Sequence, residues 1–365
     1  MRATKLRSRY FLGMASVTLC GVNALTGASS TSSPAPAGIS WSPPGATTDM
    51  DPAALQAIYS DMAQDSHGDL KGIVVVRGGR LVSEHYFNGD DAGTLHDIRS
   101  ATKSITSLLM GMAIDKGVVR SVDDPISKYL PDLPRDGKEK ITIRDLLNMR
   151  SGLSADDVDA ASPGNEDTLN KSSDWMRTVY AVPMKRAPGE KYVYASINAF
   201  LAGAIVENAS HMPLDDFAKK NLFAPLAIQN FKWEHVPVNR TTGQGNFSIT
   251  TRDEAALGQM MLNGGLVDGH RIVKRQWIDA SMSRQVAISE DDPFADYYGF
   301  MWYTKDEPVG TGKIEVHFAS GNGGNKIYVV PSLHMVVAIT SSAYGHGYGQ
   351  RRSQEILLRI LAAAR

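Results

Sequence analysis

The stretch that decides the fold is residues 100–116, which read SATKSITSLLMGMAIDK. Drawn as a helix, the segment carries apolar residues around most of its circumference. Such a helix is buried in the protein rather than lying on its surface. Gly117 follows directly and is a typical helix stop. Ser100 and Lys103 stand one turn apart at the start, so their hydroxyl and amine can touch.

This pair has the composition of a nucleophile and its base. A serine hydroxyl becomes an effective nucleophile when a neighbouring base takes its proton. Lysine serves as that base only when neutral, and a pKa of about 10.4 leaves only about 0.04% of it neutral at pH 7. Burial in an apolar helix lowers this pKa by several units. We therefore predict that Ser100 is the nucleophile and that Lys103 loses its proton near neutral pH. The alternative is that Ser100 only caps the helix.

Two later segments supply groups that such a nucleophile needs. Residues 188–198 read PGEKYVYASIN, and Tyr194 is predicted to carry the nucleophile's proton to the leaving group. Residues 319–324 read ASGNGG, where the backbone N–H of Gly321 or Asn322 is predicted to complete an oxyanion hole with that of the nucleophile. The alternatives are a half-buried structural tyrosine and a plain glycine turn.

Four further residues are candidates for substrate binding. Ser196 and Asn198 follow the tyrosine in the same polar cluster, Trp175 would wall the cleft, and Asn246 would hold a substrate amine. The alternative for Ser196 or Asn198 is a helix cap. The alternative for Trp175 is packing in the core, where aromatic residues are often found.

On either side of residues 100–116, the hydrophobic pattern of the sequence predicts strands near both ends of the chain and helices between them. The strands are expected at 73–76, 81–87, 326–330 and 335–341, and the clearest helices at 50–64, 143–149, 199–209, 253–263 and 350–364. One sheet made from the two chain ends, with a helical insertion, is the simplest arrangement. We expect a sheet domain from 49–117 and 300–365, a helical lobe from 118–299, and the site between them.

The N-terminal residues are typical of an export signal. Arg2, Lys5, Arg7 and Arg9 precede a mostly apolar run at 11–22, and small residues follow. We expect a signal peptide at 1–28, a disordered linker at 29–48, and a periplasmic or secreted protein. The apolar run is shorter than the roughly 20 residues of a membrane span, and no later run is longer, so no stable membrane span is expected.

Composition and the absence of several motifs narrow the range of possible functions. The formal net charge is −1, which gives no indication of a nucleic-acid partner. The only cysteine, Cys20, lies within the expected leader, so thiol catalysis is excluded from the mature chain. Neither a His-Glu-x-x-His pair, a Gly-x-Ser-x-Gly elbow nor a P-loop is present. These absences argue against a metallohydrolase, an α/β-hydrolase and a P-loop protein.

The order and spacing of the three segments resemble the β-lactamase and penicillin-binding-protein superfamily of serine hydrolases. The chain is most similar to class C β-lactamase-like esterases and the 6-aminohexanoate-dimer hydrolase group. The resemblance runs from about residue 70 to 365 and includes residues 121–131 and 141–153. It implies an α+β fold, in which an antiparallel sheet flanked by helices carries an inserted all-helical lobe. It also implies acylation of Ser100 and hydrolysis of the acyl-enzyme by water, with a small-molecule amide or ester as substrate and with no metal or cofactor.

Two departures from the class C pattern bear on the substrate. Those enzymes place asparagine two residues after the tyrosine, where this chain has Ser196, with Asn198 two further on. The β-lactamases also carry a lysine in the segment that here reads HFASG at 317–321. Both departures argue against efficient β-lactam hydrolysis. The remaining alternatives are a β-lactamase, a D-amino-acid peptidase, and a penicillin-binding or sensor relative without turnover, and the sequence leaves the oligomeric state open.

Overall fold

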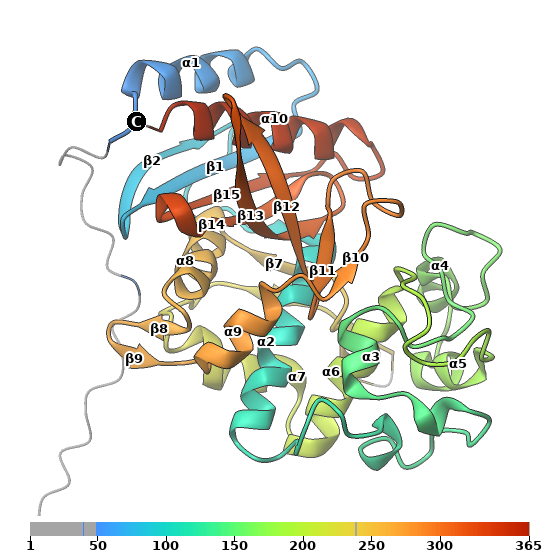
Figure 1. Ribbon diagram of the computed structural model, residues 1–365. Helices are drawn as coiled ribbons and strands as arrows, with labels where there is room; N and C mark the ends of the chain where they lie inside the picture. Colours follow the sequence, from blue (N-terminus) through green and yellow to red (C-terminus); the bar gives the residue numbers. More distant parts are fainter. Residues whose placement is uncertain (1–38, 40–48, 238, 365) are drawn as a thin grey trace, which may run out of the picture. The chain divides into compact units, whose positions relative to one another are not determined.

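An antiparallel sheet built from both ends of the chain is the main element of the structure, a computed structural model (Figure 1). The structure describes residue 39, residues 49–237 and residues 239–364, all within one unit, Pro36–Arg365. The expected signal peptide at 1–28, and the expected linker at 29–48 apart from Ile39, lie outside the described residues.

The sheet has eight strands in the order β10-β11-β12-β13-β14-β15-β1-β2, with every neighbouring pair antiparallel. The strands are β1 (Leu70–Arg77), β2 (Arg80–Tyr86), β10 (Val286–Ala287), β11 (Tyr297–Gly299), β12 (Trp302–Val309), β13 (Gly312–Gly321), β14 (Asn325–Val330) and β15 (Met335–Ser341). The strands expected at 73–76 and 81–87 form a hairpin, since β1 and β2 meet at Gly78 and Gly79, both with positive φ. The two chain ends join where Val74 pairs with Ala338. The expected α+β fold is therefore confirmed.

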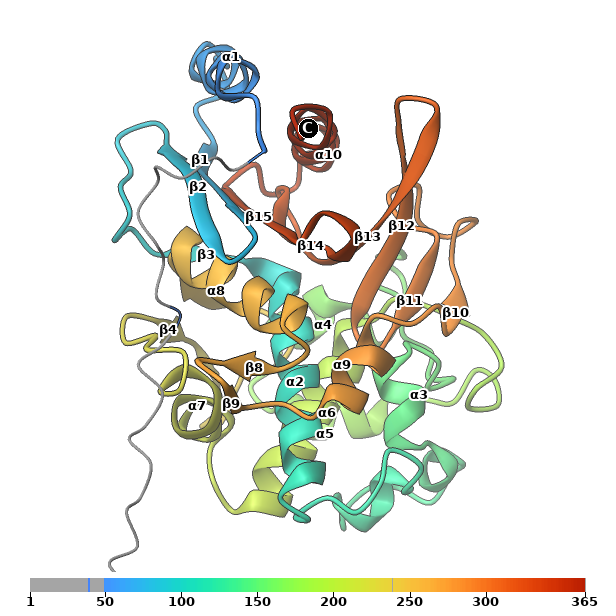
Figure 2. The ribbon, with the colours of Figure 1, turned by 60° about the vertical axis from the view of Figure 1, so that its left-hand side comes forward.

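Helices cover both faces of the sheet, as both views show (Figures 1 and 2). On one face lies α10 (Tyr348–Ala362), with α1 (Pro52–Ala63) packed against it. On the other face α8 (Thr251–Leu262) packs on β1, β14 and β15. Successive side chains of a strand point to opposite faces of its sheet. In β1, Val74 and Val76 share the face that packs against Ala255 of α8.

The helical part contains α2 (Thr102–Asp115), which follows the 3₁₀ turn η1 (Arg99–Ala101). The twelve residues from Thr102 to Ala113 are all buried, because α2 lies between the sheet and α6 (Ser196–Ser210). This confirms the prediction of a helix without a solvent face. The other helices here are α3 (Ile143–Leu147), α4 (Glu166–Asn170), α5 (Trp175–Ala181), α7 (Leu214–Ala218), the π-helical turn η4 (Lys219–Phe223) and α9 (Arg275–Ser281).

The region from 118 to 299 also supplies α8, β10 and β11 to the sheet side. Smaller elements lie in this region and elsewhere in the chain. They are β3 (His96–Asp97), β4 (Lys232–Trp233) and β7 (Phe247–Ile249) in one sheet, the pairs β5 (His235–Val236) with β6 (Arg240–Thr241) and β8 (Leu266–Val267) with β9 (His270–Arg271), and the 3₁₀ turns η2 (Ile126–Lys128), η3 (Lys138–Lys140) and η5 (Pro331–Leu333). In the part of the chain that the structure describes, no helix is long and apolar enough to cross a membrane.

Candidate active site

A strained turn places Ser100 at the start of the buried helix. Strand β3 pairs with β7, and the chain then turns at Arg99, whose φ is +52°. Asp97 holds this turn, since its carboxylate accepts the backbone N–H of Arg99 at 2.8 Å and lies 3.3 Å from the guanidinium Nε. Non-glycine residues seldom adopt this conformation, and such strain is concentrated at functional sites.

The amine of Lys103 lies against the hydroxyl of Ser100. Lys103 Nζ is 2.8 Å from Ser100 Oγ and donates a second hydrogen bond, of 3.0 Å, to the backbone oxygen of Gln244. Only 1% of Lys103 is exposed, so these contacts replace the water that a surface lysine would have. The structure thus brings together the two residues that the sequence singled out one turn apart.

Tyr194 approaches the same amine from the segment before α6. The Nζ atom of Lys103 lies 5.1 Å from the centroid of the Tyr194 ring. The backbone of this segment is fixed, since Val193 N–H donates to Met149 O at 2.9 Å and Asp157 N–H donates to Tyr194 O at 3.0 Å. Ser100, Tyr194 and Gln244 lie far apart in the sequence, and all three meet around the buried amine of Lys103.

The charge of Lys103 differs from the sequence-based expectation. Burial lowers the pKa of its amine, but Tyr194, Glu166 and Asp157 raise it, and the net direction is upward. The prediction that Lys103 loses its proton near neutral pH is therefore wrong. The sequence shows the apolar helix, but it does not show which acidic groups the fold brings to the amine.

The edge of β13 next to Ser100 is open. Strand β12 pairs with β13 only as far as Tyr303 and Phe318, so the later residues of β13 have no partner on that side. Gly321 lies so close to the Ser100 turn that an added Cβ would overlap the backbone oxygen of Ile98. A residue with a side chain could not bring this edge equally near to the nucleophile.

Of the two expected oxyanion donors, Asn322 is the better placed. It directly follows the last residue of β13 and is exposed, whereas Gly321 is buried. Its backbone N–H has no acceptor among the described residues. Its side chain is held, since Oδ1 accepts the N–H of Gly345 at 2.9 Å. The backbone N–H of Asn322 is therefore available to a substrate oxygen.

The expected substrate-binding residues are mostly buried. Ser196 is fully buried, and its Oγ has no partner among the described residues. Asn198 donates to Met149 Sδ at 3.4 Å, and its Oδ1 likewise has none. Trp175 is 3% exposed and packs edge-on against Phe200, as in the core alternative.

Asn246 lies on the loop that passes the Ser100 turn. A Cβ added to the preceding Gly245 would be 3.9 Å from the backbone of Arg99. Asn246 is partly exposed with a φ of +54°, and its backbone oxygen accepts from Glu234 N–H at 3.1 Å. Among the expected substrate-binding residues, only Asn246 combines exposure with a place beside the nucleophile.

Sequence reasoning missed three groups at this site: Gln244, Asp157 and Glu166. Gln244 supplies the carbonyl for Lys103, and the glycines on both sides of it, Gly243 and Gly245, were a usable signal of close backbone approach. Asp157 lies in the irregular stretch before α4 and Glu166 is the first residue of that short helix, and no periodic pattern marks a function at either position.

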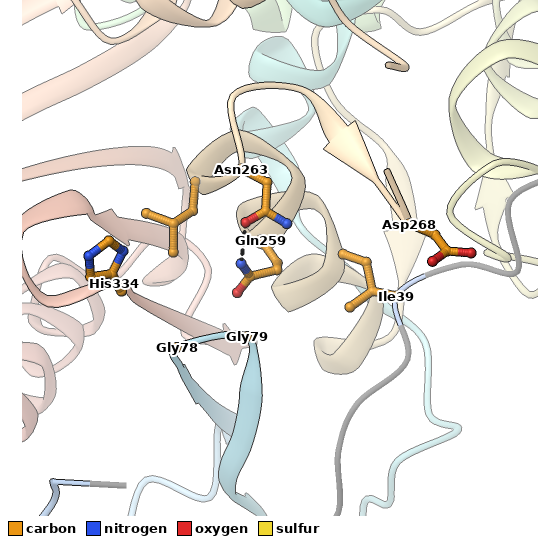
Figure 3. Close-up of a pocket in the computed structure, with 8 residues that line it drawn as sticks. Ile39, Gly78, Gly79, Gln259, Asn263, Asp268 and His334 are labelled. Atoms are coloured by element: carbon orange, nitrogen blue, oxygen red, sulfur yellow. Dashed lines mark hydrogen bonds between the residues drawn. The ribbon is translucent and has the colours of Figure 1, made fainter. Parts of the chain in front are cut away.

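One hollow lies away from these groups. A cavity of about 340 Å³ opens beside the β1–β2 turn, where Gly78 and Gly79 face Gln259, Asn263 and the His334 ring (Figure 3). None of the predicted site residues lines this cavity. Within residues 39, 49–237 and 239–364, no cluster of three or more His, Cys, Asp or Glu side chains is arranged to hold a metal ion.

Comparisons with known proteins relate the chain to a curated relative and to solved structures of similar fold. A 6-aminohexanoate-dimer hydrolase from Paenarthrobacter ureafaciens is 24% identical over 290 residues, covering 74% of this chain and 71% of that protein. A penicillin-binding protein homologue from Caulobacter crescentus has a similar fold, with a TM-score of 0.66, 16% identity, and coverage of 85% of this chain and 97% of that one.

A second solved structure and a family model complete the comparison. D-amino acid amidase from Ochrobactrum anthropi gives a TM-score of 0.64 at 18% identity, covering 85% of this chain and 97% of that one. The family model described as beta-lactamase matches residues 60–360, which is most of the chain. The chain therefore belongs to the beta-lactamase family.

Proposed function

We propose that this serine hydrolase cleaves an amide or ester bond of a small molecule through an acyl-enzyme on Ser100. The observation that carries the proposal is the buried amine of Lys103, 2.8 Å from Ser100 Oγ and adjacent to Tyr194. The open edge of β13 beside it supports the same proposal, because a substrate carbonyl needs both a nucleophile and a nearby N–H donor.

Acylation begins when Ser100 Oγ attacks the substrate carbonyl carbon and its proton passes to the Lys103–Tyr194 pair. Because the pKa of Lys103 is raised, the pair accepts this proton only after it has itself released one. The carbonyl oxygen, now an anion, takes hydrogen bonds from the backbone N–H groups of Ser100 and Asn322. The C–N or C–O bond then breaks, and the leaving group receives the proton through Tyr194.

Deacylation repeats these steps with water. The Lys103–Tyr194 pair takes a proton from a water molecule, and the hydroxide attacks the ester carbon of the acyl-enzyme. The bond to Ser100 Oγ breaks, the serine regains its proton, and a carboxylic acid leaves. A relative that binds and acylates but cannot activate this water would remain labelled, which separates the sensor alternative from a true hydrolase.

Open-chain amides and esters are the proposed substrates. The hydrolase name of the Paenarthrobacter ureafaciens relative supports a linear amide. The lysine that β-lactamases carry near this edge is missing, since Ala319 precedes Ser320 and Gly321, and this argues against β-lactams. His317 does not replace that lysine. Its ring is buried against Thr304 at 2.8 Å, and burial lowers its pKa.

Export is part of the proposal. The cluster Arg2, Lys5, Arg7 and Arg9 before the apolar run at 11–22 supports a cleaved leader and a periplasmic or secreted enzyme. The test is N-terminal sequencing of the protein recovered from a bacterial host. A mature chain that begins between residues 24 and 30 and lies outside the cytoplasm is expected, and an intact N-terminus in the cytoplasm would reject export.

The test of the function uses the purified protein and its Ser100→Ala variant. Short p-nitrophenyl esters, 6-aminohexanoate dimer and nitrocefin are offered in turn, and a fluorophosphonate probe is followed by mass spectrometry. We expect one probe adduct on Ser100, turnover of an ester or the linear amide, and little turnover of nitrocefin. Labelling without product release would favour the sensor alternative, and labelling elsewhere would reject Ser100.

A further inference from the structure

We propose that Asp157 is a positioning residue that clamps the Tyr194 backbone and stabilises the charge of the Lys103 amine. The inference rests on the proposed function, since it assumes that Ser100, Lys103 and Tyr194 carry the reaction. It adds a residue to that machinery which has no place in the three sequence segments that pointed to the site.

The contacts of Asp157 bracket Tyr194. The backbone N–H of Asp157 donates to the backbone oxygen of Tyr194 at 3.0 Å. Its carboxylate Oδ2 accepts the backbone N–H of Ser196 at 2.7 Å. One residue thus holds the chain before and after Ala195 and fixes the backbone from which the Tyr194 side chain projects.

The second contact also completes the start of α6. The N-cap residue of this helix is Ala195, which has no side-chain group to accept the free N–H groups of the first turn. Asp157, 38 positions before it in the chain, supplies the missing acceptor. A carboxylate at a helix N-terminus is further favoured by the helix dipole. The helix that follows Tyr194 is therefore tied to Asp157.

Asp157 is itself held in place. Its second oxygen, Oδ1, accepts the backbone N–H of Glu166 at 3.1 Å. The buried side chain of Asn165 donates to the backbone oxygen of Asp157 at 3.2 Å and to two neighbouring carbonyls in the same loop. Both carboxylate oxygens of Asp157 and its backbone N–H and C=O groups are hydrogen-bonded. The residue is therefore fixed in position, unlike an acid on the free surface.

Charge links the same residue to Lys103. Tyr194, Glu166 and Asp157 are the groups that raise the pKa of Lys103 against its burial. In the other direction, burial raises the pKa of Asp157, while the amine of Lys103 and the contacts with Ser196 lower it and Glu166 raises it. A carboxylate whose charge acts on the amine stabilises the ammonium form that results when the pair takes the proton of Ser100.

The variants separate positioning from charge. Asp157→Asn keeps the size and an acceptor oxygen but removes the charge, and Asp157→Ala removes both. Glu166→Gln removes a charge that acts on Lys103 but leaves the Asp157 contacts with Tyr194 and Ser196. Asp156→Asn is the matched control, because the Asp156 carboxylate accepts only from the backbone of its own loop, at Val158 and Asp159.

The measurement is the pH dependence of kcat and KM on a p-nitrophenyl ester, with thermal unfolding as a check of the fold. Asp157→Ala should lower kcat about 10- to 100-fold with a small change in KM, because a displaced Tyr194 misplaces the proton transfer. Asp157→Asn and Glu166→Gln should each move the acid limb of the profile about half a pH unit or more to lower pH. Asp156→Asn should match the wild type.

The outcomes distinguish this inference from the function on which it rests. Wild-type kcat in Asp157→Ala, or an unmoved acid limb in Asp157→Asn while Ser100→Ala is inactive, would overturn the role of Asp157 alone. Activity that survives Ser100→Ala would remove the proposed function. If Asp157→Ala fails to fold, Asp157→Asn decides, because it retains an acceptor for the Ser196 N–H.

Discussion

Two buried lysines in this protein touch serines at the same distance and yet differ in charge. Lys103 on α2 lies 2.8 Å from Ser100 Oγ, and Lys326 on β14 lies 2.8 Å from Ser320 Oγ. The two lysines are 1% and 2% exposed. The pKa of Lys103 is raised, whereas burial lowers the pKa of Lys326 to about 7.

The neighbours of the two amines explain the difference. Around Lys103 stand Tyr194 and two carboxylates. Lys326 lies over the rings of Phe318, at 4.6 Å, and Tyr328, at 5.9 Å, while the effect of Asp292 and Glu307 is too small to offset burial. Proximity to a serine therefore does not set the charge of a buried lysine; the acidic groups that the fold brings to it do.

The two serines differ as well, and the largest predicted effect tests this. Ser100 opens a helical segment beside a free strand edge, whereas Ser320 lies within β13, paired with Lys326. Ser100→Ala should lower ester turnover at least about 10³-fold, and Ser320→Ala should stay within about threefold of the wild type. Turnover of p-nitrophenyl esters measures both. Similar losses in the two variants would mean that the comparison does not identify the nucleophile.

The second prediction removes each amine in turn. Lys103→Met should slow acylation about 10²-fold or more, because the site loses the proton acceptor of Ser100. Lys326→Met should acylate at nearly the wild-type rate. Stopped-flow labelling with a fluorophosphonate gives both rates, and circular dichroism checks that each variant is folded. A slow Lys326→Met variant with an intact fold would show that both lysines serve the reaction.

The third prediction concerns the loss of folding stability caused by burying Lys326. The unfolded lysine binds a proton below about pH 10.4, but the folded one does so only below about pH 7, so wild-type stability falls as the pH drops through this window. Lys326→Met should therefore be more stable than the wild type by about 3 kcal/mol at pH 6–7, after the loss of its hydrogen bond to Ser320.

Urea unfolding at pH 7 and pH 10 measures this gap. The advantage of Lys326→Met should shrink towards zero as the pH approaches 10, because the folded lysine is then neutral and the unfolded one is close to its own pKa. A gap that stays constant between the two pH values would show that burial does not depress the pKa of Lys326.

The fold could be predicted where the hydrophobic pattern was strong. Residues 100–116 are apolar on all sides and form α2, and the apolar runs near both chain ends form β1, β14 and β15. Strand β12 was missed because Lys305, Asp306, Glu307 and Pro308 give it little strand character. It is a strand because β13, which alternates Ile314, Val316 and Phe318, pairs with it from Tyr303 to Val309.

The site could be predicted only in part, for a physical reason. The contact of Ser100 with Lys103 follows from the helix period, and Tyr194 was found from its motif. The charge of Lys103 was predicted wrongly, because Asp157 and Glu166 raise its pKa. Asp157 lies in an irregular stretch and Glu166 begins a short helix, and no local pattern shows that the fold brings their charges to act on this amine. Local spacing gives contacts within an element, whereas electrostatics depends on every element that packs around the group.

Glu254, a buried acid, extends the comparison of the two buried lysines. Its substitution gives the smallest change that we predict. Glu254 on α8 is fully buried, and neither carboxylate oxygen has a partner among the described residues. Burial, and next the charge of Asp253, raise its pKa well above the usual range. The folded state therefore keeps a proton that the unfolded chain releases above about pH 4.3, so wild-type stability falls as the pH rises from there.

Two substitutions measure this cost. Glu254→Gln does not titrate and should be about 1–3 kcal/mol more stable than the wild type at pH 7, with little difference at pH 4. Glu254→Met also removes the unpaired polar atoms and should add stability at both pH values, because the site then holds no polar group to desolvate. Urea unfolding at pH 4 and pH 7 gives the comparison. Equal stability of Glu254→Gln and the wild type at both pH values would mean that Glu254 has a partner that satisfies its charge, and that a buried acid in this fold is compensated as Lys103 is.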